Sequence, residues 1–312
     1  MNKDSKIYIA GHTGLVGSAL VRALKQQGYQ NITGKTHQEF DLTEQARVAE
    51  FFQAEKPEYV FLAAAKVGGI AANSAYPADF FTENALIQCN IIKSAWENSV
   101  KKLLFFGSSC MYPRICPQPV KEEYLLTGPV EPTNEAYALA KISGVKMCQY
   151  FNTQYGTKYI SVIPSNIYGP YDNFDLSGSH VVPGLIRKMH SAKTNNEPSV
   201  EIWGTGSPIR DFLFVEDMVD ATLFLMQAYE GNEPINIGTG SYVSVKELAE
   251  LIKEVTGYPG ELRFDTSKPD GAPVRVLDAS RLERLGWQFQ VDLAEGLRQT
   301  YEFYQGALIT QS

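Results

Sequence analysis

The chain has 312 residues and a formal net charge of −7, and 44% of its residues are hydrophobic, which is typical of a globular protein of one or two domains. The acidic balance offers no broad positive field to collect phosphates, so we expect no nucleic-acid partner. The N-terminal apolar run is too short for a signal-peptide core and no later stretch could span a bilayer, so we expect no membrane partner. The four cysteines lack zinc-like spacing, which favours free thiols, no metal and a cytoplasmic location.

In the first half of the chain, short apolar runs alternate with segments of helical periodicity. Strands are predicted at residues 6–10, near 32, and at 59–62, 102–106 and 158–163, and helices over 15–27, 44–54, 78–99 and 135–155. Such alternation with short connections is typical of a parallel sheet that has helices on both faces. We therefore predict an α/β protein with a Rossmann-like, doubly wound parallel sheet.

After Pro164 the alternation loosens, and polar residues, Gly and Pro become frequent. We predict helices over 181–192, 245–256 and 293–304, a strand around Ile202, and later strands of the large sheet at 212–215 and 235–237. The predicted nucleotide-binding domain takes residues 1–168 plus about 212–240. A smaller, discontinuous substrate domain takes about 169–211 and 241–312, and we expect it to close over the carboxyl ends of the strands, where open α/β sheets bind ligands.

A glycine-rich segment connects the first predicted strand to the first predicted helix. Glycines let the backbone turn tightly and approach a pyrophosphate, and the helix N-terminus offers free amides and the positive end of its dipole. A plain strand-to-helix turn is the alternative, but the place of the segment in the alternating pattern favours a dinucleotide. The candidate cofactor-binding residues are Gly11, His12, Thr13, Gly14, Leu15, Val16 and Gly17.

The region after the second predicted strand bears on the choice of cofactor. Folds that prefer NAD carry an acid there for the ribose 2′-hydroxyl, whereas this chain has Lys35 and His37 and no acid before Glu39. These two side chains could face a 2′-phosphate, although solvated loop residues are the alternative, so NADP(H) is favoured over NAD(H). Asp41 and Leu42, just beyond, are expected to bracket the adenine.

Three residues carry the signature of hydride chemistry at a ketone. Tyr137 and Lys141 lie four apart on a predicted helix and therefore on one face. A nearby ammonium stabilises a phenolate, so we expect Lys141 to lower the pKa of Tyr137. Ser108 follows a buried strand and can share the carbonyl oxygen with the phenol.

Cys110 and His180 add a pair of groups that plain ketone reduction does not need. A buried Cys is often a small apolar residue, and His180 could simply cap the helix that follows it. Both nevertheless fall where this fold places substrate, and a thiol and an imidazole form a workable acid/base pair near neutral pH. Which of the two is the base stays open.

Several segments together resemble the GDP-L-fucose synthases, which belong to the extended short-chain dehydrogenase/reductase superfamily. The resemblance runs from about residue 6 to 302. Its most specific parts are Gly-Ser-Ser-Cys at 107–110, Ser-His-Val at 179–181 and Lys-Pro-Asp-Gly at 268–271. It is also carried by GHTGLVGSAL, EPTNEAYALAKISG, NIYGPYDNF and WGTGSPIRDF.

The resemblance implies roles for individual residues. The catalytic set is Ser108, Cys110, Tyr137, Lys141 and His180. Further cofactor contacts are Lys141, Pro164, Ser165, Asn166, Ile167 and His180, and the substrate contacts are Lys188, Trp203, Arg210 and Asp270. Bacterial members often carry Arg at the positions of Thr13 and His37, so the strictness of the NADPH preference stays open.

By the same resemblance, the substrate is GDP-4-keto-6-deoxy-D-mannose, which undergoes 3,5-epimerisation and NADPH-dependent 4-reduction to GDP-L-fucose. The alternatives are a GDP-L-colitose synthase acting on a 3,6-dideoxy keto sugar, a sugar 4-epimerase or 4,6-dehydratase of the same superfamily, and an NADP-binding sensor without catalysis. The resemblance also implies a homodimer that pairs through the helices at 78–99 and 135–155.

Overall fold

The computed structural model describes residues 1–175, 178–268 and 270–311. Its centre is a parallel sheet with the strand order β10–β5–β4–β3–β1–β2. The strands are β1 (Ile7–Ala10), β2 (Ile32–Thr33), β3 (Tyr59–Leu62), β4 (Lys102–Phe106), β5 (Tyr159–Pro164) and β10 (Ile235–Ile237). The predicted Rossmann-like architecture is confirmed. Because β2 and β3 lie on opposite sides of β1, the strand order reverses there, which is where such folds bind ligands.

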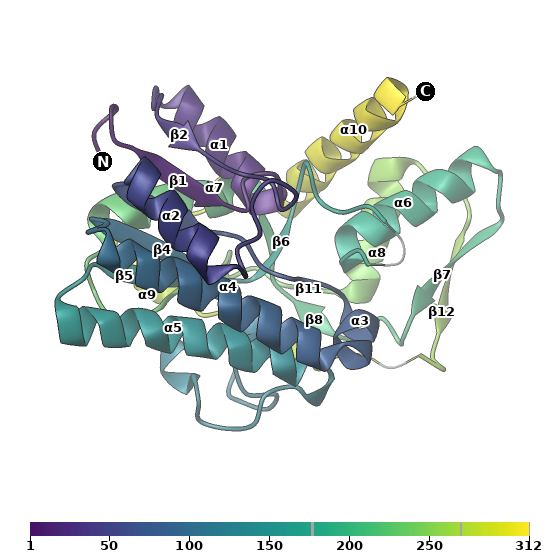
Figure 1. The fold of residues 1–312 in the computed structure, drawn as a ribbon. Coiled ribbons are helices and arrows are strands. Elements are labelled where there is room, and N and C mark those ends of the chain that lie inside the picture. The colour runs from purple at the N-terminus through teal and green to yellow at the C-terminus, as the bar shows by residue number, and fades with distance from the viewer. Residues whose placement is uncertain (176–177, 269, 312) are drawn as a thin grey trace.

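Helices cover both faces of this sheet (Figure 1). One face packs against α1 (Leu15–Gln26) and α7 (Val215–Ala228), and the other against α2 (Gln45–Glu55), α4 (Pro77–Glu97) and α5 (Glu135–Tyr155). Alternation along β1 explains the two layers, since successive strand side chains point to opposite faces. Ile7 and Ile9 join the cluster under α1 and α7, whereas Tyr8 joins the cluster under the other three helices.

Helices α4 and α5 lie side by side against the sheet, and Gly144 of α5 packs closely against both α4 and β4. A Cβ atom at this position would lie 2.4 Å from the Phe105 ring and 2.6 Å from Gln88 Oε1. Gln88 Nε2 also donates to the carbonyl of Ala140, at 2.6 Å. The first turns of α5 are therefore held firmly beside β4.

A second group of elements lies at the right of Figure 1 and builds a third apolar cluster. It contains α6 (Val181–Thr194), α8 (Val245–Thr256), α10 (Leu293–Gln311) and the parallel pair β7 (Ser199–Trp203) and β12 (Glu261–Asp265). The helix α9 (Ser280–Arg284) instead packs on the large sheet through Leu282, as does Trp287 after it. The division into two domains, with its limits, stays a proposal.

The prediction that residues 212–215 form a strand of the large sheet is wrong. The segment is a buried strand, β9 (Phe212–Phe214), but it pairs in parallel with β6 (Asn166–Tyr168) in a separate sheet. An apolar run predicts burial and extension, but it does not specify which strand becomes the partner. Residues from 215 onward form α7, a helix that the sequence reading did not predict.

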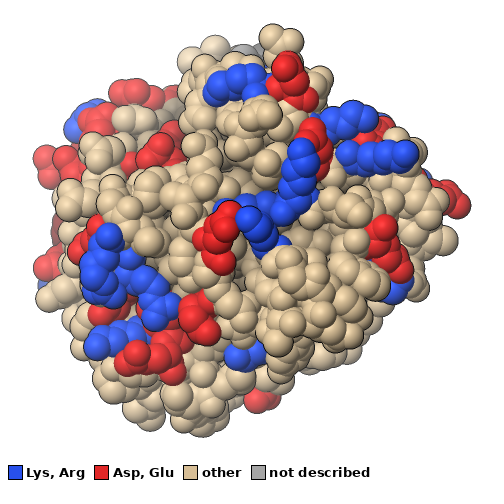
Figure 2. Space-filling view, turned by 90° about the vertical axis from the view of Figure 1, so that its left-hand side faces the viewer, with Lys and Arg blue, Asp and Glu red and all other residues tan. Residues whose placement is uncertain are grey.

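The remaining elements are short. A three-stranded sheet joins β11 (Val243–Ser244), β8 (Ile209–Arg210) and β13 (Val274–Arg275). The helix α3 (Ile70–Ala75) precedes α4, and the 3₁₀ turns are η1 (Ser109–Met111), η2 (Glu122–Tyr124) and η3 (Pro132–Asn134). On the face in Figure 2, Lys and Arg side chains lie beside Asp and Glu side chains. In the described part of the chain, no helix is both long and apolar enough to cross a membrane.

Candidate active site

The glycine-rich segment forms the tight turn that its composition predicts. Gly11 has φ +82°, and a Cβ there would lie 2.8 Å from the backbone of Ala64. A Cβ on Gly17 would lie 2.0 Å from the carbonyl oxygen of Gly11. Both positions therefore require glycine, one for its backbone conformation and both for the close approach of main chain.

The turn ends at a helix start that is open to an anion. Gly14 is the N-cap of α1 and is exposed, as is Thr13, and no side chain of the described residues caps this helix. The first amides of a helix have no partner within the helix and attract negative charge. The residues present therefore fit a dinucleotide pyrophosphate.

The residues proposed to choose between NADP and NAD lie beside this turn. The ring of His12 lies against Gly34, where a Cβ would be 2.3 Å from His12 Cγ, and its buried Nδ1 has no hydrogen-bond partner in the described structure. Lys35 and His37 are both exposed. Hydrogen bonds from Thr36 and the charge of Lys35 lower the pKa of Glu39, so this region holds charges of both signs. The predicted 2′-phosphate contact stays a prediction.

Asp41 and Leu42, proposed to bracket the adenine, are both engaged within the protein. Asp41 Oδ1 accepts from the amide and the hydroxyl of Thr43, at 2.9 and 2.8 Å, and these bonds lower the pKa of the carboxyl. Leu42 packs against the core, and its carbonyl accepts from Asn90 Nδ2 at 2.9 Å. These contacts fix the loop, and the adenine contact stays a prediction.

Ser108, Cys110 and Tyr137 meet at the carboxyl end of β4. Ser108 caps η1, and its Oγ accepts from the thiol of Cys110 at 3.0 Å. The Ser108 hydroxyl also faces the Tyr137 phenol and acts to lower the pKa of that phenol. The serine hydroxyl thus links the thiol and the phenol in one network.

Lys141 lies under this network and is only 3% exposed. Its Nζ donates to the carbonyl oxygen of Phe106 at 2.8 Å and lies 5.9 Å from the centroid of the Tyr137 ring. Burial lowers the pKa of Lys141 to about 8, while the neighbouring Cys110 acts to raise it. The ammonium is therefore anchored to the end of β4.

Lys141 is not among the groups that lower the pKa of Tyr137 in this structure, and the predicted effect of the ammonium together with a cationic nicotinamide stays a prediction. Burial raises the pKa of Tyr137 well above its ordinary value, Cys110 raises it further, and only the hydrogen bond with Ser108 opposes them. The reason is physical: desolvation disfavours the phenolate more than the neighbouring groups stabilise it. Tyr137 is accordingly protonated at neutral pH, the form that can donate a proton.

The Cys110 thiol is subject to opposing influences. Burial raises its pKa, and the hydrogen bond with Ser108 and the positive charges of Arg275 and Lys141 lower it. Arg275 is a residue that the sequence reading did not single out. It contacts the Cys110 segment through a hydrogen bond to the Pro113 carbonyl, 162 positions away along the chain, for which no local motif is a signal.

His180 lies apart from this network in the described contacts. It is the exposed N-cap residue of α6 and makes no hydrogen bond to Ser108, Cys110, Tyr137 or Lys141 among the described residues. Burial raises the pKa of Asp172 to about 6, and the neighbouring His180 acts in the opposite direction. Asp172 was not identified from the sequence, because it lies in a polar loop without a distinguishing spacing.

The predicted substrate residues cluster around an exposed indole. Trp203 is 59% exposed, with Lys188 Nζ and Lys268 Nζ at 5.7 and 5.6 Å from its ring. Asp270 holds the following turn by accepting from the amide and the hydroxyl of Thr205, at 2.9 and 2.7 Å. An open aromatic face with two cations beside it suits a planar base that carries phosphates. Pro269 of the Lys-Pro-Asp-Gly motif lies outside the described residues.

Arg210 lies on β8, and residues 164–167 follow the end of β5 into β6. Burial lowers the pKa of Arg210 to about 10, and Arg275 lowers it further while Asp270 raises it. Pro164 ends β5, the amide of Ser165 donates to Ile237 at 2.9 Å, and β6 begins immediately afterwards with Asn166 and Ile167. These residues lie at a strand end, as the predicted cofactor contact requires, and the contact itself stays a prediction.

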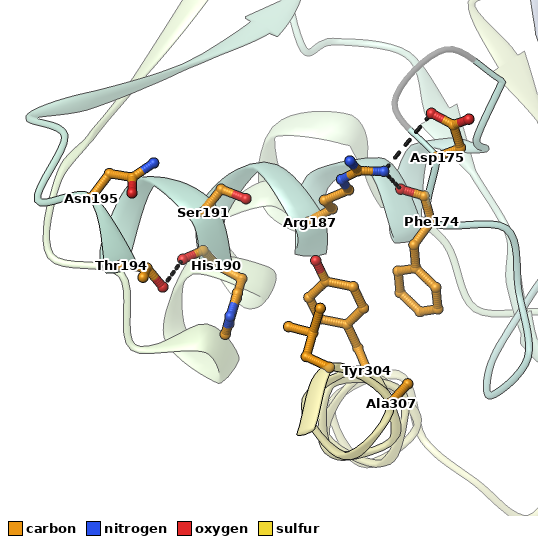
Figure 3. Close-up of a pocket in the computed structure, with 10 residues that line it drawn as sticks. Phe174, Asp175, Arg187, His190, Ser191, Thr194, Asn195, Tyr304 and Ala307 are labelled. Carbon is orange, nitrogen blue, oxygen red and sulfur yellow. Dashed lines mark hydrogen bonds and ion pairs between the residues drawn. The ribbon is translucent and has the colours of Figure 1, made fainter. Parts of the chain in front are cut away.

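A separate hollow of about 510 Å³ lies between α6 and α10 (Figure 3). Arg187 lies there, donating to the carbonyl of Phe174 at 3.0 Å, with Tyr304 facing it from α10. Lys188 follows Arg187 on the helix and so points about 100° away. None of the predicted site residues lines this hollow in the described chain. No group of three or more His, Cys, Asp or Glu residues there or elsewhere in the described chain could hold a metal ion.

The turn, the strand-end hydroxyls and the buried lysine agree with the comparisons to known proteins. Residues 7–238 match the NAD dependent epimerase/dehydratase family. The chain belongs to this family. Within it, the chain is 56% identical over 303 residues to GDP-L-fucose synthase 1 of Arabidopsis thaliana, a match covering 97% of this chain and 94% of that protein.

Other relatives include both a GDP-L-fucose synthase and a GDP-L-colitose synthase, the two activities between which the sequence left a choice. The GDP-L-fucose synthase of Escherichia coli is 48% identical over 308 residues, with 96% of each chain covered. The GDP-L-colitose synthase of Yersinia pseudotuberculosis is 36% identical, with 96% of this chain and 97% of that protein covered. The resemblance to the GDP-L-fucose synthases is therefore confirmed, and the likeness to the colitose enzyme is more distant.

Solved structures support the same family placement. A GDP-6-OMe-4-keto-L-xylo-heptose reductase from C. jejuni has a TM-score of 0.95 and 42% identity, with 98% of this chain and 99% of that chain covered. A GDP-L-fucose synthetase from Naegleria fowleri bound to NADP has a TM-score of 0.92 and 28% identity, with 99% of this chain and 97% of that chain covered.

Proposed function

We propose that this protein converts GDP-4-keto-6-deoxy-D-mannose to GDP-L-fucose by 3,5-epimerisation and NADPH-dependent 4-reduction. The observation that carries the proposal is the network at the end of β4, in which one serine hydroxyl joins the Cys110 thiol to the Tyr137 phenol. A ketone reductase needs the phenol, and the thiol beside it provides for proton transfer at neighbouring carbons. The family and the GDP-L-fucose synthase relatives support the same activity.

The epimerisation steps use the acidity that a ketone gives to its neighbouring carbons. With the C4 oxygen of the sugar hydrogen-bonded to Tyr137 and Ser108, negative charge that develops there during proton removal is stabilised. Cys110 and His180 exchange protons with C3 and C5, one removing a proton and the other returning one on the opposite face. His180 stands at the start of α6, and its approach to the sugar is part of the proposal.

Reduction then requires a proton for the C4 oxygen. When bound, NADPH supplies a hydride, and the glycine turn and the start of α1 are the residues that would hold its pyrophosphate. Tyr137 gives the proton, which agrees with the raised pKa that keeps its phenol protonated. Lys141, fixed on the Phe106 carbonyl, holds positive charge near the phenolate that remains after the transfer.

Substrate recognition is assigned to the exposed cluster. Trp203 provides a flat apolar face for the guanine, and Lys188 and Arg210 provide cations for the diphosphate. Asp270 acts on the turn that carries Trp203, since it accepts two hydrogen bonds from Thr205. GDP-L-colitose formation remains the second candidate, because the same reactive groups suit a 3,6-dideoxy keto sugar.

The enzyme is proposed to be a cytoplasmic homodimer. All four cysteines are free thiols, which suits a reducing compartment. Large apolar side chains are exposed on both helices proposed to pair, including Phe81 and Leu86 of α4 and Leu139 and Tyr150 of α5. Light scattering after size exclusion tests the dimer, and a Leu86→Glu variant is expected to shift it toward the monomer.

The activity is tested by incubating the purified protein with GDP-4-keto-6-deoxy-D-mannose and either NADPH or NADH, with the product identified by NMR. GDP-L-fucose formed with net consumption of NADPH is expected. A product that retains the C4 ketone, or a 4-epimer formed without net consumption of cofactor, would contradict the proposal. The same assay with the 3-deoxy keto sugar separates the colitose candidate.

A further inference from the structure

Arg275 is a buried cation that the proposed reaction has not yet used. It lies on β13 and is 7% exposed. Its NH1 donates to the carbonyl oxygen of Pro113 at 3.1 Å. In the register of β13 with β8, Arg275 stands opposite Arg210. One side chain therefore connects a strand near the substrate residues to the segment that follows Cys110.

This cation lacks a carboxylate partner. Among the ion pairs of the described residues, none includes Arg275, and none includes Arg210 beside it. Burying a charge without a counter-charge is costly, and such groups are retained where their charge acts on something else. Two thiols gain from it: the charge of Arg275 favours the ionised forms of Cys110 and of Cys116, and of these only Cys110 belongs to the proposed reaction centre.

The Cys110 segment is short and is anchored at both ends. Ser108 accepts from the Cys110 thiol at 3.0 Å on one side, and the amide of Met111 donates to the Ser108 carbonyl at 3.1 Å. Pro113, three residues beyond Cys110, accepts from Arg275 on the other side. Removing Arg275 therefore removes both a charge and an anchor.

The other charged group near Cys110 is committed elsewhere. Lys141 also favours the thiolate, but its ammonium donates to Phe106, and burial lowers its pKa to about 8. Tyr137 is protonated and carries no charge, and Ser108 is neutral. Of the groups around the thiol, Arg275 is thus the cation whose charge persists through the working pH range.

We propose that Arg275 is a positioning residue that holds the Cys110 segment through Pro113 and stabilises the thiolate of Cys110, which makes Cys110 the base in the proton transfers at C3 and C5. The inference rests on the proposed function. In this step the thiolate takes a proton from the sugar carbon and becomes a thiol, and the electron pair moves onto the C4 oxygen. His180 then returns a proton on the opposite face.

Three variants separate charge from anchoring. Arg275→Gln loses the charge but keeps an N–H that can donate to Pro113. Arg275→Lys keeps the charge. Arg263→Gln is the matched control, because Arg263 is exposed on β12 and pairs only with Glu261 among the described residues.

The first measurement needs no turnover. The rate at which iodoacetamide alkylates Cys110 is followed from pH 6 to 10 by peptide mass spectrometry. We expect Arg275→Gln to slow alkylation of Cys110 about tenfold at pH 7.5 and to move the midpoint upward by about one pH unit. Arg275→Lys is expected to restore most of the rate. An unchanged midpoint in Arg275→Gln overturns the inference.

The second measurement follows exchange of the C3 and C5 hydrogens of the keto sugar with deuterated solvent. We expect Arg275→Gln to slow exchange about tenfold with little change in the KM for the substrate, and Arg263→Gln to behave as wild type. Equal loss of exchange in Arg275→Lys and Arg275→Gln would contradict a role of the charge. If wild-type protein exchanges no hydrogens, the proposed function fails, while the alkylation result still decides what Arg275 does to the thiol.

Discussion

The reaction centre and the proposed substrate surface differ in how completely the protein supports their side chains. At the end of β4, Lys141 is 3% exposed and bonded to a strand carbonyl, and Ser108 links the thiol and the phenol. Around Trp203, the indole is 59% exposed, and among the described residues two lysines lie beside its ring. The groups at the end of β4 are held by the folded chain, whereas those around Trp203 are presented to solvent.

This difference indicates how binding and chemistry are divided. Groups that act on the reacting atoms are most effective when their positions are fixed before the substrate arrives. Groups that recognise a nucleotide can remain open, because the ligand itself covers them. Variants in the buried region should therefore lower kcat, whereas variants in the exposed region should raise KM.

Tyr137→Phe should have the largest effect. The variant keeps the ring but cannot donate a proton to the C4 oxygen, so we expect kcat for reduction to fall about 10³-fold. NADPH oxidation measured at 340 nm gives the rate, and quenching of NADPH fluorescence tests cofactor binding, which should be retained. Turnover within tenfold of wild type would remove Tyr137 from the proton transfer.

Cys110→Ser should come next and should affect epimerisation more than reduction. A serine hydroxyl is a far weaker base than a thiolate, so exchange of the C3 and C5 hydrogens with deuterated solvent should slow about 100-fold. Proton NMR of the keto sugar measures the exchange. Cys89→Ser, at an exposed position, is the control and should exchange as wild type. Undiminished exchange in Cys110→Ser would exclude the thiol from the mechanism.

Lys141→Met should gain stability while it loses activity. The pKa of Lys141 is about 8 in the folded protein against 10.5 when unfolded, so the unfolded chain binds more protons between these values and the stability of the wild type rises with pH there. Below pH 8 the cost of the buried charge is fully present, and the Met variant should be more stable by about 1–2 kcal/mol. Urea unfolding at pH 7 and at pH 10 should show this gap closing as the pH rises.

Lys102→Met is the matched control for that experiment. Lys102 is also buried, at the start of β4, and burial lowers its pKa to about 8. Its ammonium donates to the carbonyls of Leu225 and Tyr229, away from the reaction centre. We expect a similar dependence of stability on pH with unchanged turnover. Loss of activity in Lys102→Met would mean that the effect of Lys141→Met on turnover is not local.

Trp203→Ala should affect the exposed region alone. Loss of the aromatic face should raise the KM for the GDP-sugar about tenfold and leave kcat within a factor of two, since a stacked base is worth about 1–3 kcal/mol. Steady-state kinetics with varied substrate measure both constants. A fall in kcat without a rise in KM would place Trp203 in the chemistry and reverse the comparison.

Lys35→Ala should have the smallest effect. An exposed lysine beside a 2′-phosphate contributes up to about 1 kcal/mol, so the KM for NADPH should rise about twofold to fivefold and the KM for NADH should not change. The ratio of the two constants is the measurement. Equal changes for both cofactors would show that Lys35 does not contact the phosphate.

The sequence predicted those parts of the site that depend on neighbours along the chain. The helix that presents Tyr137 and Lys141 follows from a spacing of four residues, and Ser108 and Cys110 follow from their place after a buried strand. Arg275 could not be predicted in this way, because its contact with the Cys110 segment is a hydrogen bond to Pro113, which lies 162 positions away along the chain. The partner of β9 was missed for the same reason.

The protonation state of Tyr137 also could not be predicted from the sequence. Its spacing from Lys141 indicates that the two side chains share a helix face, but the pKa depends on how completely the phenol is removed from water. Likewise, the position of Lys141 under the network is set by the packing of α5 on β4 and α4. The spacing along the sequence identified the residues of the site, whereas their protonation states depend on how deeply the fold buries them.

Gly144 has no Cβ atom, and this lets α5 pack close enough to set the distance between the Tyr137 phenol and a bound sugar. One methyl group at that position would collide with Phe105 and Gln88 and push the helix outward, two turns away from Tyr137. The proton donor would then retreat with its helix although no residue of the reaction had changed. In this enzyme the position of the proton donor Tyr137 therefore depends on the lack of a side chain at Gly144, on the face of α5 that packs against α4 and β4.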